Sequence, residues 1–488
     1  MKAFSIIELL VALGIMTMTL TAISLAIFNL PRTIEDTSLK AGAIAVARAG
    51  LQEAIASSST QTTLPFSTSS STGPYTTTLR IEEGEDISVS SIQEMVSWQN
   101  LFSTPQSLSL RTIIANPTSL HPACDPFVSG DWKHPVLRTS TKILKGRVAA
   151  LAATQNLLVA ALESTVTSAD STLLFYSAHG TSSPFLISGI DNAPTSHIGF
   201  SSITIGGDTV FAASAFASGS AETCEKSSAC AQVQAYSLPT AGNVSERGGI
   251  TLSTSTPPYA LKTNNIPAAA TAVIYDHGTL YVGLQKTVSG DEFNIIDAHD
   301  PSHLTWRSGL RIGRTVNDIQ IRDGYAYVSS DNPSRELTVI DVRNPSQPFL
   351  AGTWNGPSGE TFGYGTASTV HAGVVRFGRT YSNAAEFELL DTHDLSHITE
   401  AQPHDLGTAR SPQSVRDLLT QDWMTFVLLS NRLEFWNTAD TYHALVFASP
   451  YLLPAGSSGT ALTCQNNILY IGINLQDGTG TIQALSGR

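Results

Sequence analysis

A long apolar run opens the chain. It covers residues 4–28 and contains one charged side chain, Glu8. A stretch of about 20 apolar residues is enough to cross a bilayer as a helix. Beyond Pro31, apolar residues recur every three or four positions, which is typical of an amphipathic helix. The pattern therefore predicts one helix over 4–57, with its first part, 4–28, in a membrane or filament core and a kink at Pro31.

Alternating apolar and polar residues replace the helical pattern after a connection rich in Ser, Thr, Gly and Pro at 60–74. Three runs alternate in this way, at 75–81, 92–99 and 106–114, and each predicts a short strand. The last two are close enough to form a hairpin. We therefore expect a linker and a small β-sheet over 58–117, followed by an irregular bridge over 118–134.

A repeated unit fills the rest of the chain, 135–488, at intervals of roughly 45–70 residues. Its clearest copies each consist of an apolar strand, an Asp and a polar turn, at 293–301, 337–345 and 387–395. A second strand precedes each copy, and more degenerate copies bring the units to seven. Four short strands in each of seven units are typical of a β-propeller. The last unit has room for three strands, so we expect residues 135–143 to supply the fourth and close the ring.

Together these elements predict an α+β chain. A long N-terminal helix with a small β-sheet is expected first, and an all-β propeller with seven blades follows it.

The start of the apolar run resembles the N-terminus of type IV prepilins. A short leader, residues 1–3, contains Lys2 and ends before Phe4, and Glu8 is the fifth residue counted from Phe4. In that family a peptidase cuts before an aromatic residue, the new amino group is methylated, and a glutamate occupies the fifth mature position. The resemblance implies cleavage between Ala3 and Phe4, where the family usually has Gly before the cut. It also implies methylation of Phe4 and pairing of Glu8 with the amino group of a neighbouring subunit during assembly.

Two other interpretations of the apolar run stay open. One is an uncleaved membrane anchor. The other is an ordinary secretory signal cut near Ala22 or Ala26.

A second resemblance concerns the repeats. The run at 337–348 is similar to the LVIVD-repeat propellers, a family of surface proteins. This resemblance implies the same propeller fold for the repeated part of the chain.

The turns after the repeated strands contain acidic and histidine residues that suggest metal ligands when each turn is taken alone. Asp297, Asp341 and Asp391 occupy the same place in three copies, but the copy with Asp341 has Arg343 where the others have histidine. We therefore interpret the three Asp residues as side chains that cap the turn. A metal site is the lesser alternative, and we expect no metal and no cofactor.

Four cysteines allow three pairings. Cys224 and Cys230 lie close together in a loop of the second unit, which favours a local disulfide. That pairing leaves Cys124 to bond Cys464 and to join the start of the propeller to its last blade. Four free thiols are the alternative, and the spacings lack the paired pattern of a zinc site.

The charge balance narrows the choice of partners. Lys and Arg number 27 and Asp and Glu number 40, so the net charge is −13. This balance argues against nucleic acid or an anionic membrane surface as the main partner of the head. Only 14% of residues are charged, and Ser and Thr are abundant, which favours an extracytoplasmic β-rich protein.

No phosphate loop, nucleotide fingerprint, serine elbow or zincin helix is present, so we do not expect an enzyme. The expected function is that of a minor type IV pilin with a propeller head, at the filament tip, that acts in adhesion or surface recognition. The loop at 213–231 is the first candidate contact. The alternatives are a pseudopilin that primes filament assembly in secretion or DNA uptake, and a membrane-tethered propeller enzyme.

The expected partners follow from this function. They are other pilin subunits, the prepilin peptidase, the membrane before assembly, and an unidentified surface receptor or protein. The expected location is the inner (cytoplasmic) membrane, crossed once, and then the pilus outside the cell.

Overall fold

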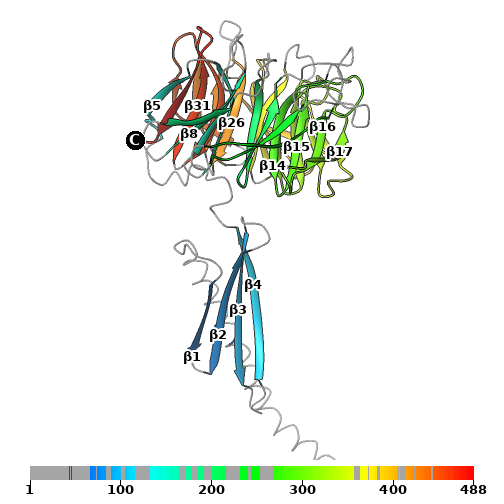
Figure 1. Ribbon diagram of the computed structural model, residues 1–488, viewed down its shortest axis with the longest axis vertical. Coiled ribbons are helices and arrows are strands. Elements are labelled where there is room, and N and C mark those ends of the chain that lie inside the picture. The colour runs from blue at the N-terminus through cyan, green and yellow to red at the C-terminus, as the bar shows by residue number, and fades with distance from the viewer. Residues whose placement is uncertain are drawn as a thin grey trace, which may run out of the picture. The chain divides into compact units, whose positions relative to one another are not determined.

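The fold is taken from a computed structural model (Figure 1). The chain forms two compact units, Met1–His121 and Pro122–Arg488. The structure describes residues 43, 46, 66–72, 74–83, 89–99, 105–115, 132–143, 146–154, 157–163, 172–178, 184–190, 199–215, 231–239, 243–252, 267–356, 363–371, 373–381, 385–404, 406, 413–421, 424–440, 443–465 and 467–488.

A four-stranded antiparallel sheet in the order β1-β2-β3-β4 forms the described part of the first unit. Its strands are β1 (Phe66–Thr72), β2 (Tyr75–Glu83), β3 (Val89–Gln99) and β4 (Pro105–Ala115). Two helical residues are also described, Ala43 and Val46. Both pack against Val96 and Trp98 of β3, and Ala43 is fully buried there.

Strand β1 corrects one prediction, because it lies in the stretch that we expected to be a flexible connection. It pairs along its whole length with β2, from Phe66 opposite Ile81 to Thr72 opposite Tyr75. Ser and Thr residues are polar, but a β-branched Thr fits an edge strand well. Pairing with β2 therefore decides the conformation of this polar stretch.

Seven four-stranded antiparallel sheets make up the second unit, in agreement with the number of repeats. We call them blades 1 to 7, starting from β6. Their strands are, for blade 1, β6 (Arg147–Thr154), β7 (Leu157–Glu163), β8 (Leu173–Ser177) and β9 (Phe185–Ile190); for blade 2, β10 (Phe200–Gly206), β11 (Thr209–Ser214), β12 (Val233–Ser237) and β13 (Glu246–Ile250); for blade 3, β14 (Ala270–Asp276), β15 (Thr279–Leu284), β16 (Phe293–Asp297) and β17 (Thr305–Leu310); for blade 4, β18 (Val316–Arg322), β19 (Tyr325–Ser330), β20 (Leu337–Asp341) and β21 (Phe349–Trp354); for blade 5, β22 (Gly365–His371), β23 (Val374–Arg379), β24 (Phe387–Asp391) and β25 (Thr399–His404); for blade 6, β26 (Val415–Gln421), β27 (Met424–Leu429), β28 (Arg432–Asp440) and β29 (His443–Leu452); and for blade 7, β30 (Ser458–Gln465), β31 (Ile468–Asn474), β32 (Gly480–Ser486) and β5 (Val136–Ile143).

Blade 7 is closed by a strand from the start of the unit, as predicted. Strand β5 runs antiparallel to β32, with Ile143 opposite Gly480 and Lys142 opposite Thr481. The Nε atom of Arg138 also donates to Ser486 Oγ at 2.6 Å. The first and last strands of the propeller therefore share one sheet.

The first strand of each blade lies at the centre of the ring. These inner strands contact their neighbours in sequence from β6 to β30, and β30 contacts β6. A bulge near the start of several of them turns one polar side chain toward the next blade. Ser201 Oγ donates to the carbonyl of Ala270 at 2.7 Å, and Asn317 Nδ2 donates to that of Gly365 at 2.6 Å. These bonds tie one blade to the next.

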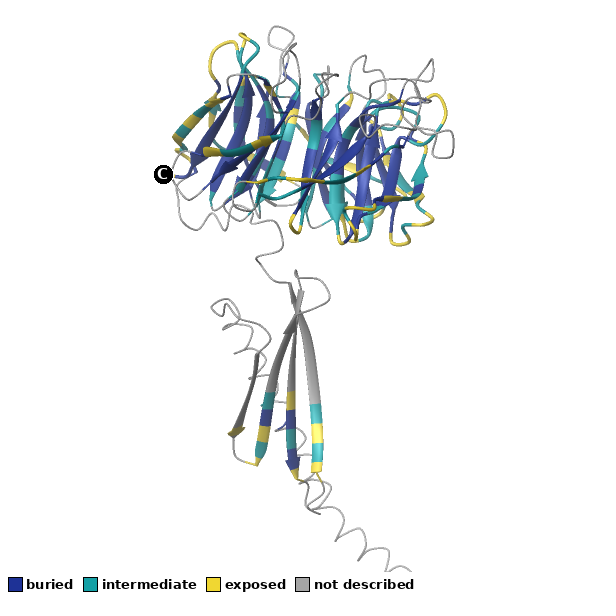
Figure 2. Ribbon diagram, in the orientation of Figure 1, coloured by how far each residue is buried: buried dark blue, intermediate teal, exposed yellow. Residues whose placement is uncertain are grey.

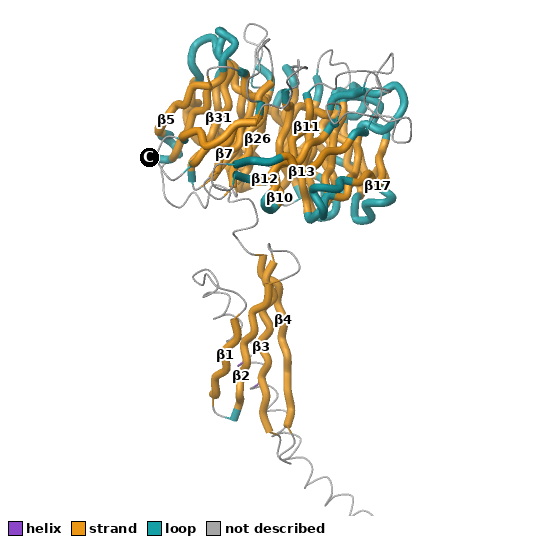
Figure 3. The backbone as a smooth tube through the Cα atoms, viewed as in Figure 1, coloured by secondary structure: helices purple, strands orange, loops and turns teal. Residues whose placement is uncertain are grey.

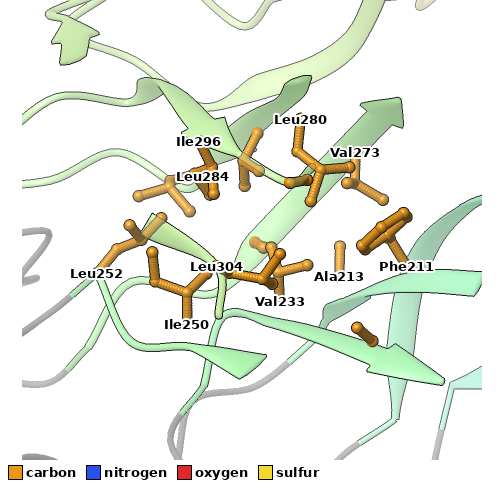
Figure 4. Close-up of a cluster of buried hydrophobic side chains, with 14 of the residues drawn as sticks. Phe211, Ala213, Val233, Ile250, Leu252, Val273, Leu280, Leu284, Ile296 and Leu304 are labelled. Carbon is orange, nitrogen blue, oxygen red and sulfur yellow. The ribbon is translucent and has the colours of Figure 1, made fainter. Parts of the chain in front are cut away.

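The core lies between blades. Between blades 2 and 3, Phe211 and Val233 face Val273, Leu280 and Ile296 (Figure 4). Strands in the middle of each blade are buried, whereas exposed residues lie on the outer strands and the turns (Figure 2). Each blade therefore depends on its neighbours to bury its apolar faces.

The expected α+β class is wrong for the part of the chain that the structure describes, which is almost entirely strands (Figure 3). The only helical residues in it are Ala43 and Val46. The α+β prediction came from the helical pattern over 4–57, whereas the described chain consists of alternating runs that pair into sheets. Apart from these two residues, the expected helix lies outside the described residues. Among the described residues, no helix is long and apolar enough to span a membrane.

Candidate functional site

The connections between strands lie on two opposite faces of the propeller, because successive strands are antiparallel. On one face, which we call the turn face, the first strand of each blade joins the second and the third joins the fourth. On the other, the loop face, the second strand joins the third and each blade joins the next. The loop face carries the longer connections.

The three predicted Asp residues lie on the turn face. Each accepts a hydrogen bond from the backbone N–H two residues later, in His299, Arg343 and His393 respectively, at 3.1, 3.1 and 3.0 Å. Burial alone would raise the pKa of Asp297. Hydrogen bonds from His299 and from Arg307 outweigh it and hold that pKa at about 2. These carboxylates hold the turn that follows them.

A glycine in the neighbouring hairpin turn explains where the adjoining side chains lie. Gly278 and Gly373 have φ values of 77° and 71°, a region that favours glycine. A Cβ atom on either glycine would come within 2.5 Å of Nε2 of His299 or His393. Nε2 of each histidine therefore lies beside the glycine, and Nδ1 lies 2.8 and 2.7 Å from Oδ1 of Asp297 and Asp391 respectively. No group of three His, Cys, Asp or Glu side chains among the described residues is placed to hold a metal.

Two carboxylates on the inner strands, Asp318 and Asp417, directly follow a bulge, and the sequence interpretation missed both. Asp318 Oδ2 accepts from the backbone N–H of Ser368 at 2.7 Å, and Asp417 Oδ2 accepts from that of Leu462 at 2.6 Å. Each therefore bridges to the inner strand of the next blade. Burial raises the pKa of both carboxyls, that of Asp417 to about 7, and the nearby Asp318 adds to that rise. Their shared place in β18 and β26, directly after the bulge, was the available signal.

Stability should therefore fall between about pH 4 and pH 7 through Asp417. Its pKa is higher in the folded than in the unfolded state, so the folded state binds more protons in that window and loses stability as the pH rises. We expect the free energy of unfolding, measured with urea on the full chain, to fall less between pH 5 and pH 8 in Asp417→Asn than in the parent. Asp323→Asn, an exposed turn residue, is the matched control. An unchanged pH response in Asp417→Asn would contradict this assignment.

A buried side chain that accepts backbone hydrogen bonds recurs beneath the loop face. The residue before the third strand is buried and acidic or amidic in blades 2 to 5. Each of these side chains accepts from a backbone N–H in the connection to the next blade: Gln232 from Leu252 at 2.7 Å, Glu292 from Ile312 at 2.9 Å, Glu336 from Gly356 at 3.3 Å and Glu386 from Leu406 at 2.8 Å. The two connections of each blade are thereby held together, which gives this face a fixed framework.

Blades 4 and 5 add a buried ion network to this framework. Arg379 of β23 is fully buried and donates from Nε and Nη2 to the two carboxylate oxygens of Glu336, both at 2.8 Å. Its Nη1 atom also lies 3.3 Å from Glu388 Oε1. The guanidinium carbon is 5.7 Å from the ring centre of Trp354. The network joins the loop of one blade to the middle strands of the next.

The remaining predicted site residues are mostly outside the described part of the chain. This holds for Ala3, Phe4 and Glu8, for Cys124, Cys224 and Cys230, and for most of the loop at 213–231. Cys464 lies in β30 and is disulfide-bonded. Its pairing with Cys124 stays a prediction.

Comparison with known proteins identifies one part of the chain. The family model described as LVIVD repeat matches residues 313–356, which contain blade 4. No curated protein matches. Among solved structures, one described as "AfRom2 CNH domain" covers 73% of this chain and 100% of its own, at 7% identity and a TM-score of 0.39. That likeness is too low to carry an argument. The sheets and the repeat match together show that the second unit is a seven-bladed β-propeller that contains an LVIVD repeat.

Proposed function

We propose that the chain is a pilin-like filament subunit and that its propeller is a recognition head. One observation carries the first part of this proposal. Ala43, a helical residue, is fully buried against Val96 and Trp98 of a four-stranded antiparallel sheet. A helix packed on a small antiparallel sheet is the arrangement that the resemblance to type IV pilins implies.

The N-terminal pattern adds the assembly step. Cleavage before Phe4 gives a cationic amino group, and Glu8 offers it a carboxylate inside an apolar surrounding, where opposite charges attract strongly. The partners are then the prepilin peptidase, the membrane before assembly, and neighbouring subunits in the filament. A head of the size of Pro122–Arg488 would crowd its neighbours along a shaft, which favours the tip or sparse incorporation.

The head acts by binding in this proposal. On consecutive blades its loop connections are fixed by hydrogen bonds to the buried carboxylates of Glu292, Glu336 and Glu386. Loops on a rigid scaffold are common binding surfaces. Adhesion or surface recognition is the function that uses such a face outside the cell.

Surface labelling tests where the head acts. Intact cells are treated with a membrane-impermeant biotin reagent, filaments are sheared off, and the chain is sought in the sheared fraction. Biotinylated chain in sheared filaments is the expected result. Chain that stays unlabelled inside the envelope would contradict the adhesin proposal and favour a pseudopilin.

A further inference from the structure

Four cationic residues lie in three neighbouring connections of the loop face between blades 3 and 4. Lys286 follows β15, Arg311 and Arg314 lie between β17 and β18, and Arg335 lies between β19 and β20. We call these four residues the basic cluster. It stands out in a chain with a net charge of −13.

Hydrogen bonds place the three connections against one another. Arg335 Nη2 donates to the carbonyl of Ile312 at 3.2 Å, beside Arg311. Arg311 Nη2 donates to the carbonyl of Val288 at 3.2 Å, and the backbone N–H of Lys286 donates to Thr315 Oγ1 at 3.3 Å, next to Arg314. The connection that contains both arginines therefore lies between the other two.

The two arginines flank a tight, fixed turn at Gly313. This glycine has a φ of 79°, and its N–H donates to Glu292 Oε2 at 2.8 Å. A Cβ atom added there would meet nothing within 4 Å, so the outer side of the turn is open. The buried Glu292 thus holds the backbone from below while Arg311 stays exposed.

Three carboxylates lie in the same connections as the cations. Glu292 is fully buried and its oxygens accept from backbone and from Thr287. Asp291, Asp331, Arg314 and Arg335 are partly buried, whereas Lys286 and Arg311 are exposed. Among the described residues, none of the four cations lies within 4.0 Å of a carboxylate oxygen. The two exposed charges of the cluster, Lys286 and Arg311, are therefore both positive.

We propose that the basic cluster binds an acidic polysaccharide, whose carboxylate or sulfate groups pair with Lys286, Arg311, Arg314 and Arg335. This inference rests on the proposed function, because it names a ligand class for the recognition head. The planar guanidinium group binds two oxygens of such an anion at once. Val288, which is 60% exposed beside Arg311, adds apolar surface for the C–H groups of a sugar ring.

A polysaccharide fits better than a nucleic acid. Single-stranded nucleic acids are held by bases that stack on aromatic side chains, and the described residues at 286–288, 311–315 and 331–335 include no aromatic residue.

Binding of the purified full-length chain to immobilised heparin, polygalacturonate, neutral dextran and a single-stranded oligo(dT) tests the proposal. The parent should bind heparin and polygalacturonate but not dextran. Its binding to heparin should be roughly tenfold or more weaker at 200 mM than at 50 mM salt. Arg311→Ala and Arg314→Ala should each weaken binding about fivefold, and the double variant about twentyfold. Arg322→Ala, on the turn face of the same blade, is the matched control and should bind as the parent does.

Three outcomes would overturn the inference. They are a double variant that binds heparin as the parent does, an equal loss in Arg322→Ala, and tighter binding of oligo(dT) than of heparin. Equal urea midpoints in all variants exclude a folding defect. The binding assay uses purified chain and needs no filament. A negative result would therefore overturn the ligand class alone, whereas surface labelling tests the filament proposal.

Discussion

Replacing Arg379 by Ala should lower the free energy of unfolding of the propeller by about 3–5 kcal/mol. The guanidinium is fully buried and pairs with Glu336 and Glu388. Without it, two buried carboxylates would face each other with no cation between them, and burying an unpaired charge is costly. The contact between the guanidinium and Trp354 would also be lost.

Urea unfolding of the full-length chain measures this effect, with Arg322→Ala as the control for an exposed arginine. The triple variant Arg379→Leu, Glu336→Gln, Glu388→Gln should recover much of the loss, because it removes all three charges together. A midpoint for Arg379→Ala within error of the parent would refute the role of the network. A triple variant no better than Arg379→Ala would show that packing, and not charge, dominates.

Trp132→Ala should cost the propeller about 3–5 kcal/mol. Trp132 precedes the closing strand β5 and is only 2% exposed. Its ring lies 5.3 Å from that of Phe426 in an edge-on arrangement and 6.5 Å from that of Phe435. It therefore fixes the start of β5 to blade 6, and its loss leaves a large cavity where the ring is closed.

Hydrogen exchange locates this effect. In Trp132→Ala, exchange should rise first in β5 and β32, while β14 to β17 on blade 3 stay protected. Lys133→Ala is the matched neighbour, because it removes a cation–π contact at 5.5 Å to Phe447, worth about 0.5–1 kcal/mol at an exposed site, and leaves Trp132 in place. Faster exchange spread evenly over all blades would show that closure does not depend on Trp132.

The propeller was largely predictable because its signal is local and repeated. Strands such as Leu337–Asp341 are short apolar runs bounded by turns, and the shortage of one strand in the last unit indicated closure by 135–143. The strand at Phe66–Thr72 was missed because its sequence is polar, and only pairing with β2 reveals it.

The charged sites of the loop face were not predictable in the same way. Arg379 and Glu336 are 43 residues apart in the chain, and their pairing depends on how blade 5 packs on blade 4. The basic cluster likewise combines three connections that no local pattern links. Trp132 lay in a stretch that we expected to be an irregular bridge, where a lone tryptophan among polar and proline residues was the one available sign.

Intact-mass analysis and N-terminal sequencing of the chain from membranes and from sheared filaments test the central claim most directly. The account predicts a chain that begins at methylated Phe4 and is recovered in the sheared filaments. A chain that still begins at Met1 and stays in the membrane fraction would contradict it.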